Sequence, residues 1–304
     1  MASPTFDAWN LGCEVVSVNG IELKVHVAGS GPAVVLCHGF PELGFSWRHQ
    51  VGPLCDAGFQ VLVPDMRGFG GSSAPPGREG YDVFNLGADL TGLLDAFGLE
   101  DAVFVGHDWG AAVVWHLAIG APDRVRAVAG LSVPFTRRAP APPVSILRRR
   151  LGEDFYMVWF QEPGAADPVL ARDVRRTLGA AEFWTPEWLA SDAPEGRPAW
   201  LTDDEFEAYV GEFERTGFTG GLNYYRNIDE NWRLAEALGE RRVEQPSLFM
   251  AGSVDPVLRL MPATGIEARL GDPRALIMVD GAGHWLQQER PDEVSDALLE
   301  FLAD

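Results

Sequence analysis

The sequence predicts an α/β fold, in which a mostly parallel sheet is wrapped by helices and interrupted by an inserted helical cap. Short apolar runs rich in β-branched residues alternate with helical stretches as far as Leu131. A proline-broken stretch follows at residues 137–143, and beyond it the pattern is amphipathic and helical with no obvious strands. Strand-like runs resume at Pro246. With 304 residues, 46% of them hydrophobic, the chain can bury a large core.

An antiparallel hairpin is predicted at the start of the sheet, because residues 14–18 and 21–27 flank the turn pair Asn19-Gly20. The following strands are expected near residues 33–37, 60–64, 102–106 and 126–131. Helices are expected near residues 46–57, 83–97 and 110–120. Regular alternation of strand and helix is typical of parallel strands joined by helical crossovers.

The change of pattern after Phe135 divides the chain into a core of residues 1–135 and 243–304 and a helical cap of residues 136–242. Within the cap, Thr202-Asp203-Asp204-Glu205 is a capping box that opens a helix. An apolar lid of this kind would enclose a reaction site on the core and keep stray water out of it.

The pentapeptide Gly106-His107-Asp108-Trp109-Gly110 carries the most specific chemical signal. It lies between a strand-like and a helical run, as a nucleophile elbow does, but has a carboxylate where esterases have serine. The flanking glycines permit a strained backbone at Asp108. A carboxylate suits displacement at a saturated carbon, which leaves an alkyl ester that water must cleave. The pattern indicates ring opening or dehalogenation; the alternative is a turn with an ordinary N-cap aspartate.

Two further side chains complete the order of nucleophile, acid and histidine that this class of fold uses. Asp255 follows the strand-like run 247–252, and His284 follows the run 275–280. Because the carboxyl ends of parallel strands meet at one edge of a sheet, we expect the two side chains to lie beside Asp108. His284 would activate the water, and Asp255 would orient the histidine.

The stretch His38-Gly39-Phe40-Pro41, which follows the buried strand 33–37, is predicted to supply part of an oxyanion hole. Negative charge develops on an oxygen of Asp108 when water attacks its ester, and fixed N–H donors are needed there. The backbone N–H groups of Phe40 and Trp109 are the predicted pair. Pro41 has no N–H and a fixed φ, so it would stiffen the loop without donating.

These motifs resemble the soluble epoxide hydrolases of the α/β-hydrolase fold. The likeness runs from Cys37 to Phe135 and returns at residues 155–156, 160–164, 222–227 and 283–285, so it spans nearly the whole chain. It implies a mostly parallel eight-stranded sheet flanked by helices, with an inserted all-helical cap. It also implies conversion of an epoxide and water to a vicinal diol through a covalent alkyl ester on Asp108, with no metal or other cofactor.

The resemblance assigns Tyr156 and Tyr225 as two cap phenols that hold the epoxide oxygen. An epoxide opens to an alkoxide, a poor leaving group that must be protonated as it forms. A phenol has an ordinary pKa of about 10, so it stays protonated at neutral pH. The alternative is that either tyrosine is a packed core aromatic. Four aromatic residues near the motifs are predicted collectively to line the pocket: Trp159, Phe160, Tyr224 and Trp285.

Two other classes of protein stay open. A haloalkane-type dehalogenase uses the same aspartate nucleophile, although Phe40 lacks the side-chain N–H that halide release calls for. A non-catalytic ligand-binding protein on the same fold would bind in the pocket without turnover. A serine esterase is disfavoured, because the chain contains no Gly-x-Ser-x-Gly.

Composition limits the expected partners. The 24 basic and 44 acidic residues give a net charge of −20, which repels phosphate backbones and anionic membrane surfaces, so neither nucleic acid nor membrane is expected. The predicted partner is a small apolar or aromatic epoxide. Residues 1–7 lack a signal-peptide pattern and no apolar run could span a bilayer, so a cytoplasmic location is expected. Whether the chain forms a homodimer stays open.

Overall fold

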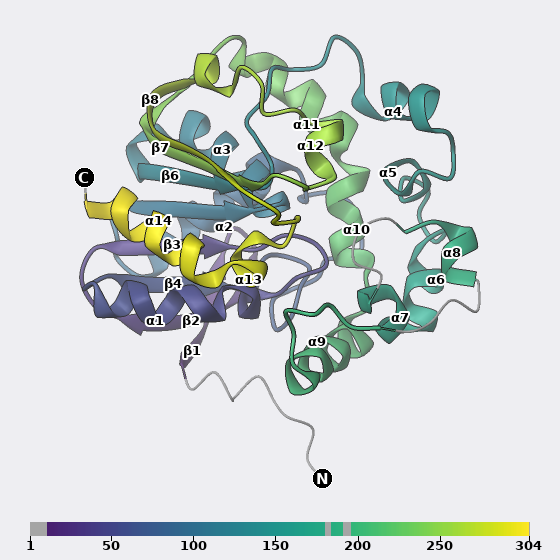
Figure 1. The fold of residues 1–304 in the computed structure, drawn as a ribbon, viewed down its shortest axis with the longest axis horizontal. Helices are drawn as coiled ribbons and strands as arrows, with labels where there is room; N and C mark the ends of the chain where they lie inside the picture. Colours follow the sequence, from purple (N-terminus) through teal and green to yellow (C-terminus); the bar gives the residue numbers. More distant parts are fainter. Residues whose placement is uncertain (1–10, 180–183, 191–195, 304) are drawn as a thin grey trace.

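The computed structural model describes residues 11–179, 184–190 and 196–303. Residues 1–7, for which no signal peptide is predicted, lie outside the described residues. The structure contains an eight-stranded sheet in the order β1-β2-β4-β3-β5-β6-β7-β8 (Figure 1). The strands are β1 (Gly12–Val18), β2 (Ile21–Gly29), β3 (Ala33–Cys37), β4 (Gln60–Pro64), β5 (Ala102–His107), β6 (Val125–Leu131), β7 (Val243–Gly252) and β8 (Leu270–Val279).

The sheet is mostly parallel, which confirms the predicted fold class. β2 pairs antiparallel with both β1 and β4, and every other pair of neighbouring strands is parallel. The predicted hairpin is present: Asn19 and Gly20 connect β1 to β2, and both have positive φ values, 41° and 77°. Positive φ at both central residues is what a tight hairpin turn of the primed type requires.

Helices cover both faces of the sheet. α1 (Arg48–Asp56) and α14 (Pro291–Ala303) pack on one face, and α2 (Val83–Ala96) and α3 (Trp109–Gly120) pack on the other. Alternate residues of β3 separate accordingly, with Val34 and Leu36 in one apolar cluster and Val35 and Cys37 in the other. This alternation follows from the two-residue repeat of a strand.

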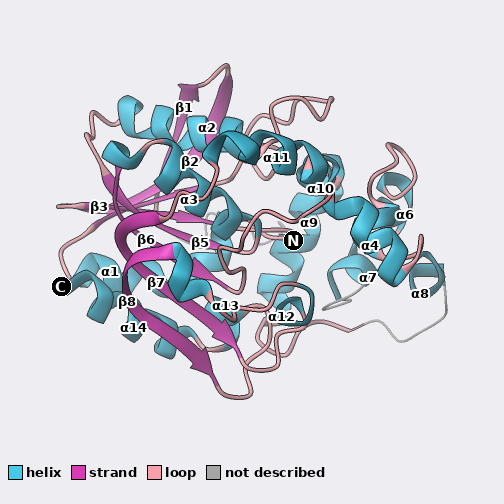
Figure 2. Cartoon of the chain, turned by 90° about the horizontal axis from the view of Figure 1, so that it is seen from above, coloured by secondary structure: helices cyan, strands magenta, loops and turns pink. Residues whose placement is uncertain are grey.

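Between β6 and β7, all the secondary-structure elements of the described residues are helical. They are α4 (Pro143–Leu151), α5 (Tyr156–Trp159), α6 (Asp167–Arg172), α7 (Val174–Gly179), α8 (Pro186–Ala190), α9 (Asp203–Thr216), α10 (Thr219–Arg226), α11 (Ile228–Leu234) and η4 (Ala235–Leu238). Figures 1 and 2 both place α4, α6, α7 and α8 to one side of the sheet. The predicted capping box opens α9, where Thr202 accepts from the Glu205 N–H and Glu205 accepts from the Thr202 N–H.

Short helices complete the fold: η2 (Gly44–Trp47), η3 (Pro122–Arg124), α12 (Val257–Leu260), η5 (Ile266–Arg269) and α13 (Leu286–Glu289). α12 and α13 follow β7 and β8, so they belong to the loops at the carboxyl edge of the sheet. In the part of the chain that the structure describes, no helix combines the length and the apolar character needed to cross a bilayer.

Candidate active site

Five loops at the carboxyl edge of the parallel strands build the candidate site. One polar or backbone group comes from each: Phe40 after β3, Asp108 after β5, Ser132 after β6, Asp255 after β7 and His284 after β8. Open α/β sheets bind their ligands at this edge. The topology therefore collects residues that lie up to 244 positions apart in the chain, 40 to 284.

The backbone of Asp108 is strained at the start of α3. Its φ of 52° and ψ of −118° are unusual for a residue with a Cβ, and such strain costs on the order of 1–3 kcal/mol. The two flanking glycines are required by space: a Cβ on Gly106 would lie 2.3 Å from the Gly110 carbonyl oxygen, and one on Gly110 would lie 2.1 Å from the Cys37 carbonyl oxygen. The turn presents the Asp108 carboxylate at the N-terminal end of α3, where the helix dipole favours negative charge.

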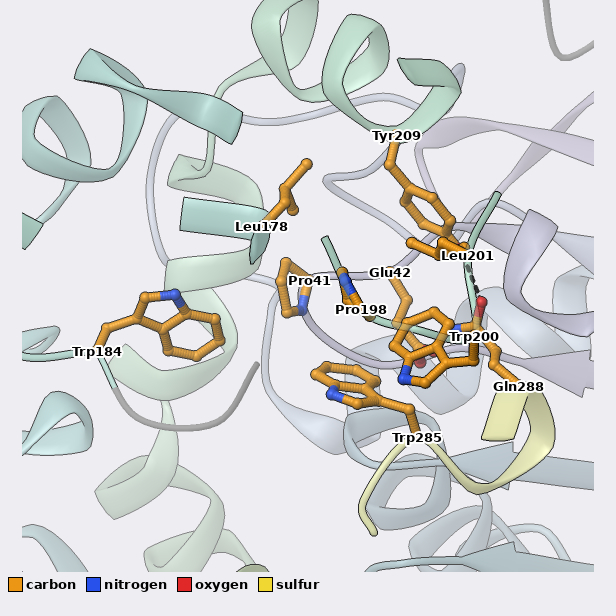
Figure 3. A pocket seen from close by; sticks show the side chains of 10 residues that line it. All are labelled: Pro41, Glu42, Leu178, Trp184, Pro198, Trp200, Leu201, Tyr209, Trp285 and Gln288. Carbon is orange, nitrogen blue, oxygen red and sulfur yellow. Dashed lines mark hydrogen bonds between the residues drawn. The ribbon is translucent and has the colours of Figure 1, made fainter. Parts of the chain in front are cut away.

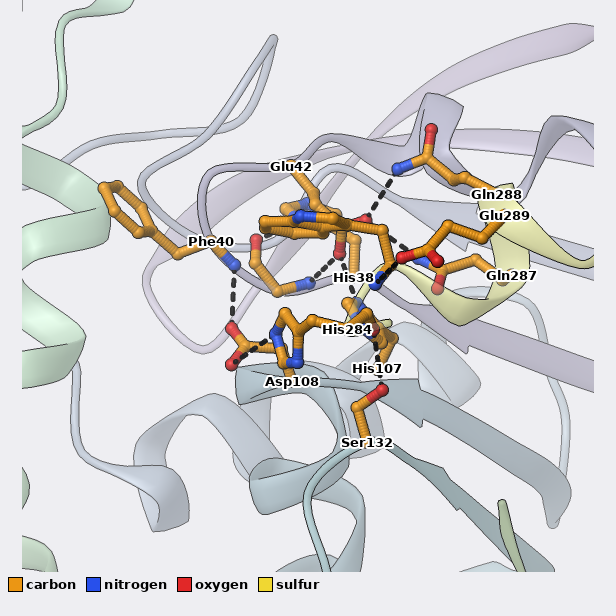
Figure 4. Close-up of polar contacts among 12 residues, drawn as sticks. His38, Phe40, Glu42, His107, Asp108, Ser132, His284, Gln287, Gln288 and Glu289 are labelled. Carbon is orange, nitrogen blue, oxygen red and sulfur yellow. Dashed lines mark hydrogen bonds and ion pairs between the residues drawn. The ribbon is translucent and has the colours of Figure 1, made fainter. Parts of the chain in front are cut away.

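The Asp108 carboxylate lies between a backbone donor and the imidazole of His284 (Figure 4). The Phe40 N–H donates to Oδ1 at 3.0 Å, and Nε2 of His284 lies 3.6 Å from Oδ2. On the other side of the ring, Nδ1 donates to the Asp255 carboxylate at 3.0 Å. The structure thus brings together the three side chains predicted as nucleophile, acid and histidine, in the predicted order.

Of the two predicted oxyanion donors, the Phe40 N–H contacts the Asp108 carboxylate, and the Trp109 N–H lies at the start of α3. The Phe40 N–H already contacts the carboxylate. Trp109 is the first residue of α3, so its N–H is one of the four that have no partner within the helix. It directly follows Asp108 in the chain, at the same end of the helix.

The charges of the site form a buried ion pair at neutral pH. Burial opposes ionisation of Asp108, but the facing His284 outweighs it and lowers the pKa of the carboxyl. Burial lowers the pKa of His284, yet Asp108 and Asp255 together raise that pKa to about 10. Asp108 is therefore a carboxylate and His284 an imidazolium in the free protein.

Stability should depend on pH through His284. A histidine whose pKa is raised by folding contributes stability that is fully present below its unfolded pKa of about 6.5 and is lost as pH rises through its folded pKa. With a folded pKa of about 10, the loss falls between these two values. We expect the difference in Tm between the wild type and His284→Gln to shrink steadily over this range, measured by calorimetry; a constant difference would contradict the buried ion pair.

The backbone of His284 is held by two donors. Its carbonyl oxygen accepts from Nε2 of His107 at 2.8 Å and from the hydroxyl of Ser132 at 2.7 Å. Nδ1 of His107 donates to the buried Glu42 carboxylate at 2.6 Å. Both ring nitrogens of His107 therefore contact oxygen atoms, which fixes the orientation of the ring.

Glu42 is the centre of this buried network (Figure 4). Besides His107, it accepts from the Gly39 N–H at 3.0 Å and from the side-chain amides of Gln287 and Gln288 at 2.8 and 3.0 Å. Burial raises the pKa of Glu42, but the charge of His107 outweighs it and holds the pKa below its ordinary value. The network ties the Phe40 loop to the His284 loop, because Gly39 precedes Phe40 and the two glutamines follow His284.

The sequence analysis did not identify four polar side chains of this network: Glu42, Ser132, Gln287 and Gln288. His38 acts on the neighbouring loop, accepting from the Met66 N–H at 2.9 Å. The partners of Glu42 lie 3 to 246 residues away along the chain, so no local pattern pairs them. The one available signal was the position of Glu42 and Ser132 just after the carboxyl ends of two buried strands.

The two predicted phenols come from α5 and α10, two of the helices between β6 and β7. The rings of Tyr156 and Tyr225 lie 5.8 Å apart, and the ring of Tyr225 lies 5.1 Å from that of Trp109. Both are almost fully buried. Burial raises the pKa of each phenol above its ordinary value, and the charge of the nearby Asp108 raises it further. Both tyrosines therefore stay protonated and can donate.

The four predicted pocket aromatics occupy different positions. Phe160 contacts both phenols, at 5.5 and 5.2 Å between ring centres, and Trp159 packs on Phe160. Trp285 packs on His284 at 4.9 Å. Tyr224 is fully buried and donates its hydroxyl to the Arg67 carbonyl at 2.8 Å, which ties α10 to the loop after β4.

Two cavities adjoin the site. The larger, about 860 Å³, begins at Asp108, Trp109 and Tyr225 and has mostly apolar walls. Its volume is within the usual range for small-molecule sites. The smaller, about 30 Å³, is lined by Pro41, Glu42 and Trp285 together with Trp184, Trp200 and Tyr209 from the segment between β6 and β7 (Figure 3). It has room for about one water molecule.

An aspartate at a strained strand-to-helix turn, paired with a histidine and a second aspartate on an eight-stranded sheet, defines the α/β-hydrolase class. The family described as alpha/beta hydrolase fold matches residues 32–291. The chain is 50% identical to epoxide hydrolase A of Mycobacterium tuberculosis, over 95% of this chain and 96% of the relative, and 38% identical to epoxide hydrolase 2 of Siraitia grosvenorii, over 94% and 96%. The crystal structure of epoxide hydrolase A from Mycobacterium thermoresistibile superposes with a TM-score of 0.90 at 47% identity, covering 96% and 98% of the two chains. The chain belongs to the epoxide hydrolases of the α/β-hydrolase fold.

Proposed function

We propose that this epoxide hydrolase converts an epoxide and water to a vicinal diol in two half-reactions, with Asp108 as the nucleophile. The observation that carries the proposal is the position of the Asp108 carboxylate. It lies at the end of a largely apolar cavity, between the Phe40 N–H and the imidazole of His284, and close enough to two protonated phenols to raise their pKa values.

In the first half-reaction, a carboxylate oxygen of Asp108 attacks one carbon of the epoxide and the carbon–oxygen bond of the ring breaks. The oxygen that leaves is an alkoxide as it forms, and the hydroxyls of Tyr156 and Tyr225 hold it. One phenol gives it a proton. The product is a hydroxyalkyl ester of Asp108 and a phenolate, and the low-dielectric surroundings favour return of a proton to that phenolate.

In the second half-reaction, His284 takes a proton from water, which attacks the Asp108 carbonyl carbon. Esterification removes the negative charge of Asp108, one of the two charges that raise the pKa of His284, so the ring becomes able to give up a proton. Before water attacks, His284 gives its proton through solvent to the phenolate, which restores the phenol. The neutral ring then serves as base, Asp255 orients it, and the N–H groups of Phe40 and Trp109 stabilise the oxyanion. The ester breaks as the proton of the newly added hydroxyl passes to the leaving oxygen, so the diol leaves with Asp108 again a carboxylate and His284 again an imidazolium.

We assign residues 136–242 as the cap, because this segment supplies both phenols and part of the cavity wall. Trp159, Phe160, Tyr224 and Trp285, which the sequence predicts to line the pocket, are not among the residues that line the larger cavity; Phe160 packs against both phenols and Trp285 packs on His284. An apolar or aromatic substrate fits the composition of the cavity wall. The mechanism calls for no metal or organic cofactor. A cytoplasmic location remains a prediction from the sequence.

The assay that tests the reaction is a panel of aryl and aliphatic epoxides screened for vicinal diols, with matched haloalkanes screened for halide release. We expect diol from at least one epoxide and no enzyme-dependent halide. Release of halide without diol would favour a dehalogenase. Saturable binding of epoxides without any product would favour a ligand-binding protein.

Loss of the phenols should slow ring opening specifically. General acid catalysis contributes about 10²–10⁴-fold, so we expect the double variant Tyr156→Phe/Tyr225→Phe to lose kcat by that factor, and each single variant by less because the other phenol remains. Pre-steady-state quenching of tryptophan fluorescence would measure the alkylation rate. Tyr209→Phe, a buried cap tyrosine whose hydroxyl bonds to Gln288 instead, is the control. A double variant that alkylates at the original rate would remove the phenols from the mechanism.

A further inference from the structure

The two helices that carry the phenols both end close to them. α5 contains Tyr156 and ends at Trp159, and Tyr225 lies in the last turn of α10, which ends at Arg226. The last carbonyls of a helix have no partner within it, so they need donors from elsewhere. Here two side chains cross between the helix ends and supply such donors, one in each direction.

The side-chain amide of Gln161 bonds to the backbone beside each phenol. Its Nε2 donates to the carbonyl of Tyr225 at 2.8 Å and to the carbonyl of Met157 at 2.8 Å. Tyr225 carries one phenol, and Met157 directly follows Tyr156, which carries the other. A single amide group therefore joins the backbone at one phenol to the backbone next to the other.

The side chain of Arg226 makes the reciprocal contact. Its Nε donates to the carbonyl of Phe160 at 3.1 Å, and the N–H of Phe160 donates to the carbonyl of Tyr156 at 2.8 Å. Arg226 is buried, and its other two nitrogens donate to the Asn223 side chain at 3.0 Å and to the Asp167 carboxylate at 2.5 Å. Because three acceptors surround the planar guanidinium, its position is fixed.

We propose that Gln161 and Arg226, together named the clasp, are positioning residues that set the spacing of the two phenol oxygens to fit one epoxide oxygen. The proposal rests on the proposed function and adds two residues to it. The rings of Tyr156 and Tyr225 lie 5.8 Å apart on separate helices, so the backbone that carries them decides whether both hydroxyls reach the same atom. A misplacement of about 1 Å can cost about 10²-fold in rate.

The clasp should affect ring opening and not hydrolysis of the ester, because Asp255 and His284 follow β7 and β8, outside the helices that the clasp joins. In Gln161→Met, a side chain of similar size preserves the packing but has no N–H to donate. With styrene oxide as substrate, we expect the alkylation rate to fall about tenfold or more. The hydrolysis rate of the alkyl-enzyme and the Tm should stay close to those of the wild type. Pre-steady-state tryptophan fluorescence measures both rates, and calorimetry measures the Tm.

A double-mutant cycle separates positioning from a general loosening of the fold. In the Tyr156→Phe/Tyr225→Phe background no hydroxyl is left to position, so Gln161→Met should leave the already slow alkylation rate unchanged. Equal fold-losses in both backgrounds, or no loss beside intact phenols, would overturn the clasp. If Gln161→Met does not fold, Arg226→Lys takes its place in the same cycle, because one ammonium group cannot reach the three acceptors that the guanidinium spans.

Gln245→Met is the matched control and should leave the alkylation rate unchanged. Gln245 is partly buried like Gln161, and its Nε2 also donates to two carbonyls, of Ala118 at 2.8 Å and of Pro122 at 3.3 Å. It lies near the start of β7, at the opposite edge of the sheet from the site.

Failure of the proposed function gives a different result, neither diol nor alkyl-enzyme from the wild type with any epoxide. The same cycle is then measured as the Kd of benzamide, whose carbonyl oxygen can accept from both phenols. Gln161→Met should weaken this binding only where both phenols are intact, and equal weakening in both backgrounds, or none, would overturn the clasp.

Discussion

Asp108→Asn is expected to abolish the conversion of every epoxide to diol, with a fall in kcat of about 10⁴-fold or more, as for the loss of other catalytic nucleophiles. The neutral amide cannot attack the ring, while Phe40 and His284 still hold a side chain of the same shape. The change should therefore leave the fold and the apparent affinity for substrate largely intact. Steady-state diol formation and binding of an unreactive diol measure the two effects separately.

Two further variants make this result specific. The side-chain amide of the Asp108→Asn variant can hydrolyse to aspartate and restore activity. Asp108→Ala has no such amide and excludes this explanation. Asp280→Asn, an exposed aspartate at the end of β8, is the matched control and should keep wild-type kcat. In heavy-oxygen water under single-turnover conditions, the label should enter the Asp108 carboxylate and not the first diol. A label that enters the first diol and is absent from the polypeptide would show direct attack by water.

The parts of the site that the sequence predicts are those that the sheet topology positions. Asp108, Asp255 and His284 each follow a strand that composition alone reveals, and parallel strands bring their carboxyl ends to one edge. The strained turn at Asp108 could also be predicted from the sequence, because Gly106 and Gly110 indicate positions where the backbone has no space for a Cβ.

The parts that the sequence does not predict depend on packing between distant segments. Glu42 is a buried carboxylate whose partners come from the β5 turn and from α13, and only the folded chain shows that they meet. The backbone carbonyl of His284 accepts hydrogen bonds from His107 and Ser132. Every residue has such a carbonyl, so no residue type in the sequence marks this one. The wall of the larger cavity is also of this kind: of the three consecutive arginines Arg148–Arg150, only Arg150 lines it, and nothing in the sequence distinguishes that residue from its neighbours.

His284→Gln is expected to separate the two half-reactions and trap the alkyl-enzyme. Glutamine keeps a polar group near Asp255 but cannot take the proton of the attacking water, so hydrolysis of the ester should slow by about 10²–10⁴-fold. Alkylation should continue, because the attacking group is Asp108 and the acids are the phenols. Intact-protein mass spectrometry should then show a species heavier by the mass of one epoxide, and peptide mapping should place it on Asp108.

The alkyl-enzyme accumulates only if Asp108 stays ionised in the His284→Gln variant. His284→Gln also removes the cation that lowers the pKa of Asp108, but without it the carboxylate keeps the Phe40 N–H and the helix terminus, and at neutral pH it remains the nucleophile. The double variant Asp108→Asn/His284→Gln should form no adduct, and His49→Gln, an exposed histidine of α1, should form none that persists. A His284→Gln protein that released diol at the wild-type rate would mean that another base activates the water. A protein that formed no adduct and no diol would mean that the imidazolium is needed for ring opening itself, as the source of the proton that the phenols pass on.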